Sequence, residues 1–215
     1  MSTDWLRLFH KIRTADLIEF QHALGDDGWK QIGPHTPLAE ILPTIEFKKS
    51  VLIRETEELT VHLTPDHLQS PAARTHFYIL MAAAEVGAAS VVESLMEREV
   101  IENHFKRIDG QSHEGKNWRR FEDARKSDDS VRVVQFMYFW QIQEIVESER
   151  ERLRHAFDLE KYIKDLELIT DLRNDVMHPL TPLASAYRGV SLSQIAQAAE
   201  RVAMGDVREH YPLEN

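Results

Sequence analysis

The chain has 215 residues, contains no cysteine and carries a formal net charge of −10, so disulfide bonds and thiolate chemistry are excluded. Hydrophobic residues make up 42% and charged residues 29% of the chain, which is usual for a globular protein. Acidic residues outnumber basic ones in residues 1–69 and again in residues 70–215, which argues against a general nucleic-acid-binding surface. We therefore expect any contact with RNA to be a small local patch.

Several features that the sequence lacks bear on localisation and on metal binding. No apolar run approaches the roughly 20 residues that span a bilayer, and residues 1–5 do not begin a signal peptide. Together with the absence of cysteine, this favours a cytoplasmic protein without a membrane contact. The 11 histidines are scattered, and no pair has the i, i+4 spacing of a helical metal site. We expect neither a metal ion nor a cofactor.

The N-terminal part, residues 1–69, mixes helical and strand patterns. Apolar residues recur at helical spacing around Trp5 and again around Leu17, and residues 29–32 predict a short strand. Thr36 followed by Pro37 predicts the start of a helix that runs through Leu42. Residues 50–55 and 59–63 are rich in β-forming residues and predict a hairpin, after which Thr64 and Pro65 predict another helix start.

This order of elements has a counterpart in a known family. The segment Pro37-Leu38-Ala39-Glu40-Ile41-Leu42, the hairpin and Leu63-Thr64-Pro65-Asp66-His67-Leu68 together resemble a single CBS-domain repeat. Such repeats pair and often bind adenosine nucleotides. In that family a Thr or Ser, followed three residues later by Asp, holds the ribose. Thr64 matches, His67 stands at the third position, and the resemblance implies an adenine nucleotide site at these two residues. The alternative is a degenerate repeat that serves packing or dimerisation.

Residues 70–215 predict four helices, at about 72–108, 130–157, 159–177 and 191–204. The first contains a run of small residues, 82–89, which lets another helix approach closely and predicts a central position. Ser191 and Gln194 form a capping box at the start of the last helix, and Gly205 marks its end. The expected fold class is mainly α, an up-and-down four-helix bundle preceded by a small α/β segment with a β-hairpin. The expected boundary lies between residues 69 and 70.

The polar stretch from residue 109 to residue 129 shows no apolar period and predicts a loop. Its basic residues alternate with Trp118 and Phe121, an arrangement that could contact the backbone and bases of RNA. Acidic residues such as Glu122 and Asp123 lie among them and favour a solvated loop instead.

The last turn of the third predicted helix carries a dense group of polar residues. Arg173, Asn174 and His178 fall within six positions, just before a proline. Arginine binds phosphate well and histidine moves protons near neutral pH, so Arg173 and His178 are a minimal set for phosphodiester chemistry. The structural alternative is that Asn174 and His178 cap the helix while Arg173 pairs with Asp171 or Asp175.

Residues 173–179 resemble the signature of HEPN domains, in which Arg, a polar residue and a later His end the third helix of a four-helix bundle. The resemblance covers about residues 70–205. It implies a homodimer with two Arg–His sets in one cleft and, in active members, a metal-independent endoribonuclease. Arg173 would stabilise the charge on the scissile phosphate, His178 would act as general base or acid, and Asn174 would orient them. The expected product is a 2′,3′-cyclic phosphate.

Two departures bear on activity. Many toxin-type members of the HEPN family have a tyrosine two residues after the histidine, where this chain has Leu180, and Pro179 directly follows His178. Two functions therefore stay open. The first is a ribonuclease of a defence or stress system that acts on single-stranded RNA. The second is a non-catalytic regulatory module that binds a nucleotide or a partner protein.

Overall fold

A computed structural model of the protein shows a mainly helical chain, which confirms the predicted class. The N-terminal helical patterns around Trp5 and Leu17 lie outside the described residues. The structure describes residues 31–32, 37–48, 51–54, 60–63, 65–111, 115–178, 181–183, 186–187 and 189–213.

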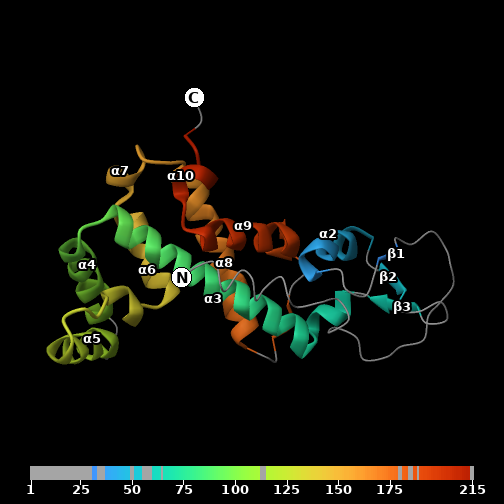
Figure 1. Ribbon diagram of the computed structural model, residues 1–215, viewed down its shortest axis with the longest axis horizontal. Helices are drawn as coiled ribbons and strands as arrows, with labels where there is room; N and C mark the ends of the chain where they lie inside the picture. The colour runs from blue at the N-terminus through green and yellow to red at the C-terminus, as the bar shows by residue number, and fades with distance from the viewer. Residues whose placement is uncertain are drawn as a thin grey trace.

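Figure 1 labels the helices and strands in chain order. In the first half they are β1 (Gln31–Ile32), α2 (Leu38–Lys48), β2 (Val51–Arg54), β3 (Thr60–Leu63), the 3₁₀ helix η2 (Pro65–Gln69), α3 (Pro71–Leu95) and α4 (Arg98–Gln111). In the second half they are α5 (Lys116–Ser127), the 3₁₀ helix η3 (Val133–Phe136), α6 (Phe139–Ser148), α7 (Arg150–Leu153), α8 (Leu159–Met177), β4 (Ala186–Tyr187), β5 (Val190–Ser191), α9 (Leu192–Met204) and α10 (Val207–His210).

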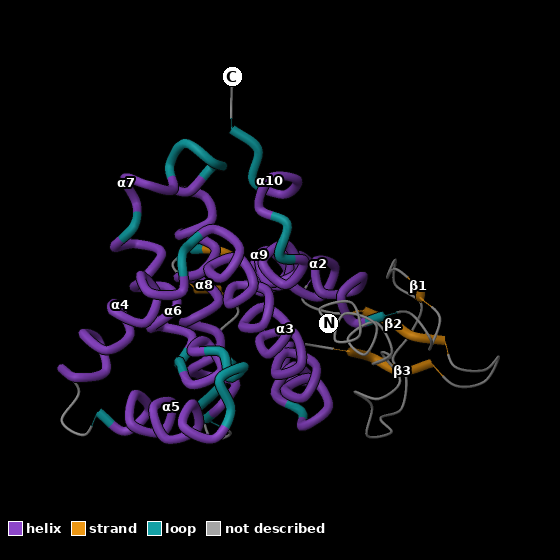
Figure 2. Tube along the Cα trace, turned by 60° about the vertical axis from the view of Figure 1, so that its left-hand side comes forward, coloured by secondary structure: helices purple, strands orange, loops and turns teal. Residues whose placement is uncertain are grey.

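A three-stranded sheet lies at the end of the molecule opposite α4 and α5, as Figures 1 and 2 both show. β2 pairs with β1 in parallel and with β3 antiparallel, with Val51 opposite Leu63 and Arg54 opposite Thr60. The predicted hairpin is therefore confirmed. β4 and β5 form a separate two-stranded pair before α9.

α3 is the central helix, as its run of small residues predicts, because α9, α8 and α6 all pack against it. The closest approach is at Gly87. A Cβ atom built there would lie only 2.1 Å from the carbonyl oxygen of Val202 in α9. By length and composition alone α3 could cross a membrane, but core helices meet the same test, and 44% of its most apolar window is buried.

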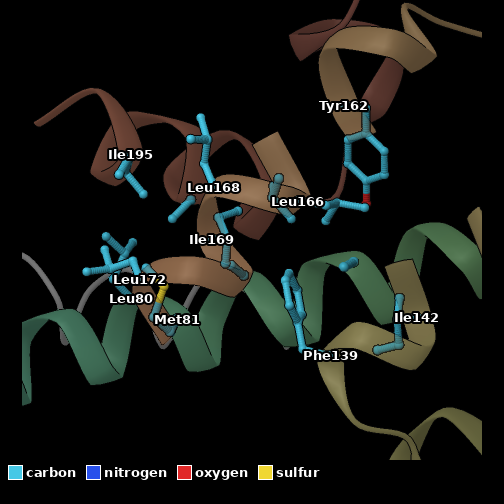
Figure 3. Packing of buried hydrophobic residues seen from close by; sticks show 14 of the residues in the cluster. Leu80, Met81, Phe139, Ile142, Tyr162, Leu166, Leu168, Ile169, Leu172 and Ile195 are labelled. Atoms are coloured by element: carbon cyan, nitrogen blue, oxygen red, sulfur yellow. The ribbon is translucent and has the colours of Figure 1, made fainter. Parts of the chain in front are cut away.

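One hydrophobic core joins these helices (Figure 3). Leu172 of α8 lies against Leu80 and Met81 of α3, all three among the most buried side chains of the chain. The buried residues of α2 belong to the same core, because α2 packs on α9; they are Leu38, Ile41, Leu42 and Ile45. The boundary between residues 69 and 70 stays a prediction, and the core continues across it.

The first predicted helix, residues 72–108, is wrong as a single element. α3 ends at Leu95, Met96 is extended with φ −126° and ψ 146°, and α4 begins at Arg98. No proline or glycine marks this break. The turn places the Met96 side chain in the core and brings α4 against α6, so packing rather than local sequence ends α3.

The loop predicted for residues 109–129 is also wrong, because α4 continues to Gln111 and α5 occupies most of the remainder. Aromatic contacts hold α5 in place. The Trp118 ring lies 5.8 Å from Phe105 of α4 and 5.4 Å from Phe121, which in turn lies 5.7 Å from Phe136 of η3. Burying these rings orders a segment whose average composition is strongly polar.

The second predicted helix, residues 130–157, is three shorter elements, η3, α6 and α7. Met137 is extended between η3 and α6, and the Tyr138 backbone N–H donates to the Gln141 side chain at 2.8 Å at the start of α6. The third and fourth helices are confirmed closely. α8 has the predicted bounds, and Ser191, Gln194 and Gly205 cap α9 as predicted.

A buried polar network ties α8, α9 and the segment after α10 together. The Oδ2 atom of Asp165 accepts from Nη2 of Arg201 at 2.8 Å, from its Nε at 3.2 Å and from the Tyr211 hydroxyl at 2.8 Å. Burial, and then the charge of Asp165, hold the pKa of Tyr211 well above its usual range. The Tyr211 ring also meets that of Tyr162 edge to face, with centroids 5.0 Å apart.

Candidate functional site

The predicted site residues lie in the last turn of α8, where the helix leaves the core. His178 is the C-terminal cap, and its backbone N–H donates to the carbonyl of Asp175 at 3.3 Å. Asn174, Met177 and His178 are exposed, whereas Leu172 and Val176 on the other face of the same turn are buried. The His178 side chain therefore faces solvent and not the core.

Arg173 forms an ion pair with a residue of α3. Its Nε atom lies 3.8 Å from a carboxylate oxygen of Glu85, and the two side chains are 26% and 32% exposed. Burial raises the pKa of Glu85, and the positive charge of Arg173 opposes that rise. The pairing of Arg173 with Asp171 or Asp175 that the sequence left open stays a prediction, and the described residues add an ion pair to Glu85.

The turn after α8 is held by two side chains that sequence reasoning missed. The guanidinium of Arg74, in the first turn of α3, donates to the carbonyls of Asp175 at 3.0 Å, His178 at 3.4 Å and Thr181. The Asp175 and His178 carbonyls also accept the backbone N–H groups of His178 and Thr181, so Arg74 adds a donor from another helix to the C-terminal turn of α8.

Gln69, the last residue of η2, extends this clamp. Its side chain accepts from the Leu183 backbone N–H at 2.7 Å and donates to the Leu183 carbonyl at 3.0 Å. The side-chain oxygen of Gln69 also accepts from Arg74 at 3.4 Å. The backbone around His178 is thus fixed by residues more than 100 positions earlier in the chain, and no local pattern in the sequence points to them.

Of the two predicted nucleotide-binding residues, Thr64 lies outside the described residues. His67 lies within η2 and is partly buried. η2 is also the helix that holds the turn after α8 through Gln69. Within the described parts of the chain, no group of three or more acidic or histidine side chains could hold a metal ion.

A shallow groove of about 200 Å³ runs beside Glu85. One side is formed by α3, the other by η3 and the start of α6; the lining includes Val86, Ala89, Val134, Met137 and Ile142. Sites that enclose a drug-sized ligand usually measure roughly 300–1,000 Å³. This groove is therefore smaller than a typical site that encloses a ligand, and its lining does not include the last turn of α8.

Comparison with known proteins gives no relative to place beside these features: no family model, no curated protein and no solved structure matches the chain.

The Arg173–Glu85 ion pair predicts that removing Arg173 alone destabilises the protein more than removing the charges of both residues. An Arg173→Ala variant should lose about 1 kcal/mol of unfolding free energy, because Glu85 keeps its desolvation cost without its partner. Adding Glu85→Gln should restore most of that loss, since a neutral amide is less costly to desolvate. Urea denaturation of both variants at pH 7 tests this, and a double variant less stable than Arg173→Ala alone would contradict it.

The same ion pair predicts how the free energy of unfolding depends on pH. Because the folded pKa of Glu85 is raised, its contribution to stability is present below the unfolded value of 4.5 and is lost as the pH rises through the folded pKa. Relative to the wild type, a single Glu85→Gln variant should therefore be more stable at pH 7 than at pH 4.

Proposed function

We propose that the chain is a metal-independent endoribonuclease of HEPN type that acts as a homodimer in a defence or stress system. The observation that carries the proposal is the exposed end of α8, where Asn174 and His178 face solvent on a backbone clamped by Arg74. The contacts among α3, α6, α8 and α9 support a four-helix HEPN-like bundle in which α8 is the third helix.

The chemistry needs a base and an acid on opposite sides of the phosphorus. One His178 removes the proton from a ribose 2′-hydroxyl, the 2′-oxygen attacks the phosphorus, and the 5′-oxygen leaves with a proton from the His178 of the second copy. The products are a 2′,3′-cyclic phosphate and a 5′-hydroxyl. Arg173 stabilises the charge that develops on the phosphate oxygens, and Asn174 orients the phosphate. A homodimer supplies both histidines from one sequence position.

The test compares cleavage of a labelled single-stranded RNA by the wild type and by the Arg173→Ala/His178→Ala variant, with a chelator present. The variant should cleave at least roughly a hundredfold more slowly, because general acid–base catalysis alone contributes about 10²–10⁴-fold. His155→Ala, at another exposed histidine, is the matched control and should keep the full rate. Equal rates in the wild type and the double variant would overturn the proposal.

A second candidate function is a non-catalytic module that binds an adenine nucleotide or a partner protein through a CBS-like segment. Two observations favour it. The order β1, α2, β2, β3, η2 suits a CBS-like repeat, and Arg173 is already paired with Glu85. A thermal-shift screen with adenine nucleotides tests this function. A shift that disappears in a Thr64→Ala variant would support it, and no shift with any nucleotide would leave only a role in binding a partner protein.

A further inference from the structure

The hairpin of α4 and α5 differs in charge from the rest of the chain. Residues 98–127 contain eight basic and six acidic residues, whereas the remainder of this acidic protein contains 18 and 30. α4 and α5 lie together at one end of the molecule, away from the sheet (Figure 1). The acidic composition of the whole chain limits any RNA contact to a small patch, and this hairpin is a region with a local excess of cations.

Three of the five cations of α5 lie on its outer face. Successive helix residues are about 100° apart, so Trp118 and Phe121 share one face, and Lys116, Arg119 and Arg120 share the opposite one. The two aromatic rings pack against α4 and η3, and Phe121 is fully buried. The three basic side chains are exposed. We call Lys116, Arg119 and Arg120 the α5 basic face.

Three acidic side chains of the hairpin have partners among the described residues, and one of them, Asp123, lies one turn after Arg119 and Arg120 on the same side of α5. Glu102 pairs with Arg98 at 2.7 Å and with Arg125 at 2.9 Å. Asp123 pairs with Lys126 at 2.7 Å. Asp109 is buried, and its carboxylate accepts the backbone N–H of Trp118 at 2.9 Å. By count, α4 carries three basic and three acidic residues and α5 carries five and two, so the excess positive charge of the hairpin lies on α5.

The position of the α5 basic face near the start of the helix strengthens its positive electrostatic potential. Lys116 occupies the first helical position, where the helix dipole is positive, and Arg119 and Arg120 follow at the fourth and fifth positions. Cations there oppose helix formation, and the N-terminal backbone is capped instead by Asp109. This arrangement is unfavourable for the isolated helix and favourable for an anion bound at its surface.

We propose that the α5 basic face binds the phosphate backbone of single-stranded RNA. Arginine and lysine contact phosphates without reading sequence, and the aromatic rings that could have stacked on bases are committed to the core. Binding is therefore independent of base sequence and strongly dependent on salt. The proposal concerns binding alone, and it holds whether or not Arg173 and His178 cleave RNA.

The test measures fluorescence anisotropy of a labelled 20-nucleotide polyuridine with 2′-O-methyl groups, which cannot be cleaved through a 2′-oxygen. The Lys116→Gln/Arg119→Gln/Arg120→Gln variant should bind at least tenfold more weakly at about 50 mM salt. Its slope of log K against log salt should be shallower by roughly 2, since each phosphate contact on a single strand contributes about 0.7. Arg150→Gln/Arg152→Gln/Arg154→Gln removes the same charge from exposed positions near α7 and should bind like the wild type.

Two results would overturn the proposal. One is equal loss of affinity in the two triple variants, because net charge rather than the α5 basic face would then explain binding. The other is tighter binding to phosphatidylserine vesicles than to the oligonucleotide, which would assign the face to a lipid surface. Binding that depends on α5 in a protein that does not cleave RNA would support this proposal while the ribonuclease proposal fails, so the two outcomes are separable.

Discussion

A Gly87→Ala variant is expected to unfold at a markedly lower urea concentration than the wild type, although alanine is the better helix former. On an exposed helix this change would stabilise the protein by roughly 1 kcal/mol. Here the new methyl group would lie 2.1 Å from the Val202 carbonyl oxygen, 2.7 Å from Ala203 Cα and 2.9 Å from its carbonyl carbon. These are main-chain atoms, so α3 and α9 must separate, and we expect a net loss of at least about 2 kcal/mol.

The Val202 carbonyl, which the new methyl group would displace, has a second role. It also accepts the backbone N–H of Gly205 at 3.1 Å, in the turn that ends α9. Ser90→Ala, which changes an exposed position one turn further along α3, is the control and should stay within about 0.5 kcal/mol of the wild type. A urea midpoint for Gly87→Ala equal to or above that of the wild type would refute the close approach of α3 and α9.

Removing the carboxylate of Asp165 should also be strongly destabilising, at about 3 kcal/mol. The Asp165 side chain is only 8% exposed and serves three donor atoms at once. In an Asp165→Ala variant the Arg201 guanidinium and the Tyr211 hydroxyl both lose their acceptor while partly or wholly buried. Urea denaturation measures the loss, and limited proteolysis should show earlier cleavage after α10.

An exposed ion pair of similar length gives the contrast. Asp123 and Lys126 lie 2.7 Å apart, but their side chains are 72% and 74% exposed, so Asp123→Ala should change stability far less than Asp165→Ala does. Tyr211→Phe alone should cost about 1 kcal/mol, and it should cost much less in the Asp165→Ala background. Equal effects of Tyr211→Phe in the two backgrounds would show that the network is not coupled.

Much of the fold was predictable where the sequence pattern and the tertiary structure agree. The hairpin, α8 and α9 carry strong local signals, namely β-branched runs, a sustained apolar stripe and a capping box. The break at Met96 and the helix α5 carry none. Met96 ends α3 because its side chain packs in the core, and α5 exists because Trp118 and Phe121 meet rings from α4 and η3. Such contacts depend on the folded chain and not on neighbouring residues.

Part of the candidate site could likewise be predicted from the sequence, and part of it could not. The sequence placed Arg173, Asn174 and His178 correctly at the end of a helix, because Pro179 and the apolar spacing define that end. The sequence did not indicate that Glu85 and Arg74 contact the end of this helix. Both lie on α3, about 90 and 100 residues earlier, and an isolated Glu or Arg in a helical stretch has many possible partners.

The clamp on the turn after α8 also has a kinetic consequence. Arg74 and Gln69 join backbone positions that lie 101 to 114 residues further along the chain. Contacts of such high separation in sequence close large loops, and the entropy of closing them makes these contacts slow to form. During synthesis α3 leaves the ribosome long before residue 183, so its first turn must wait for the partner carbonyls. The backbone that carries His178 therefore reaches its final hydrogen bonding only once residues far apart in the sequence have come together.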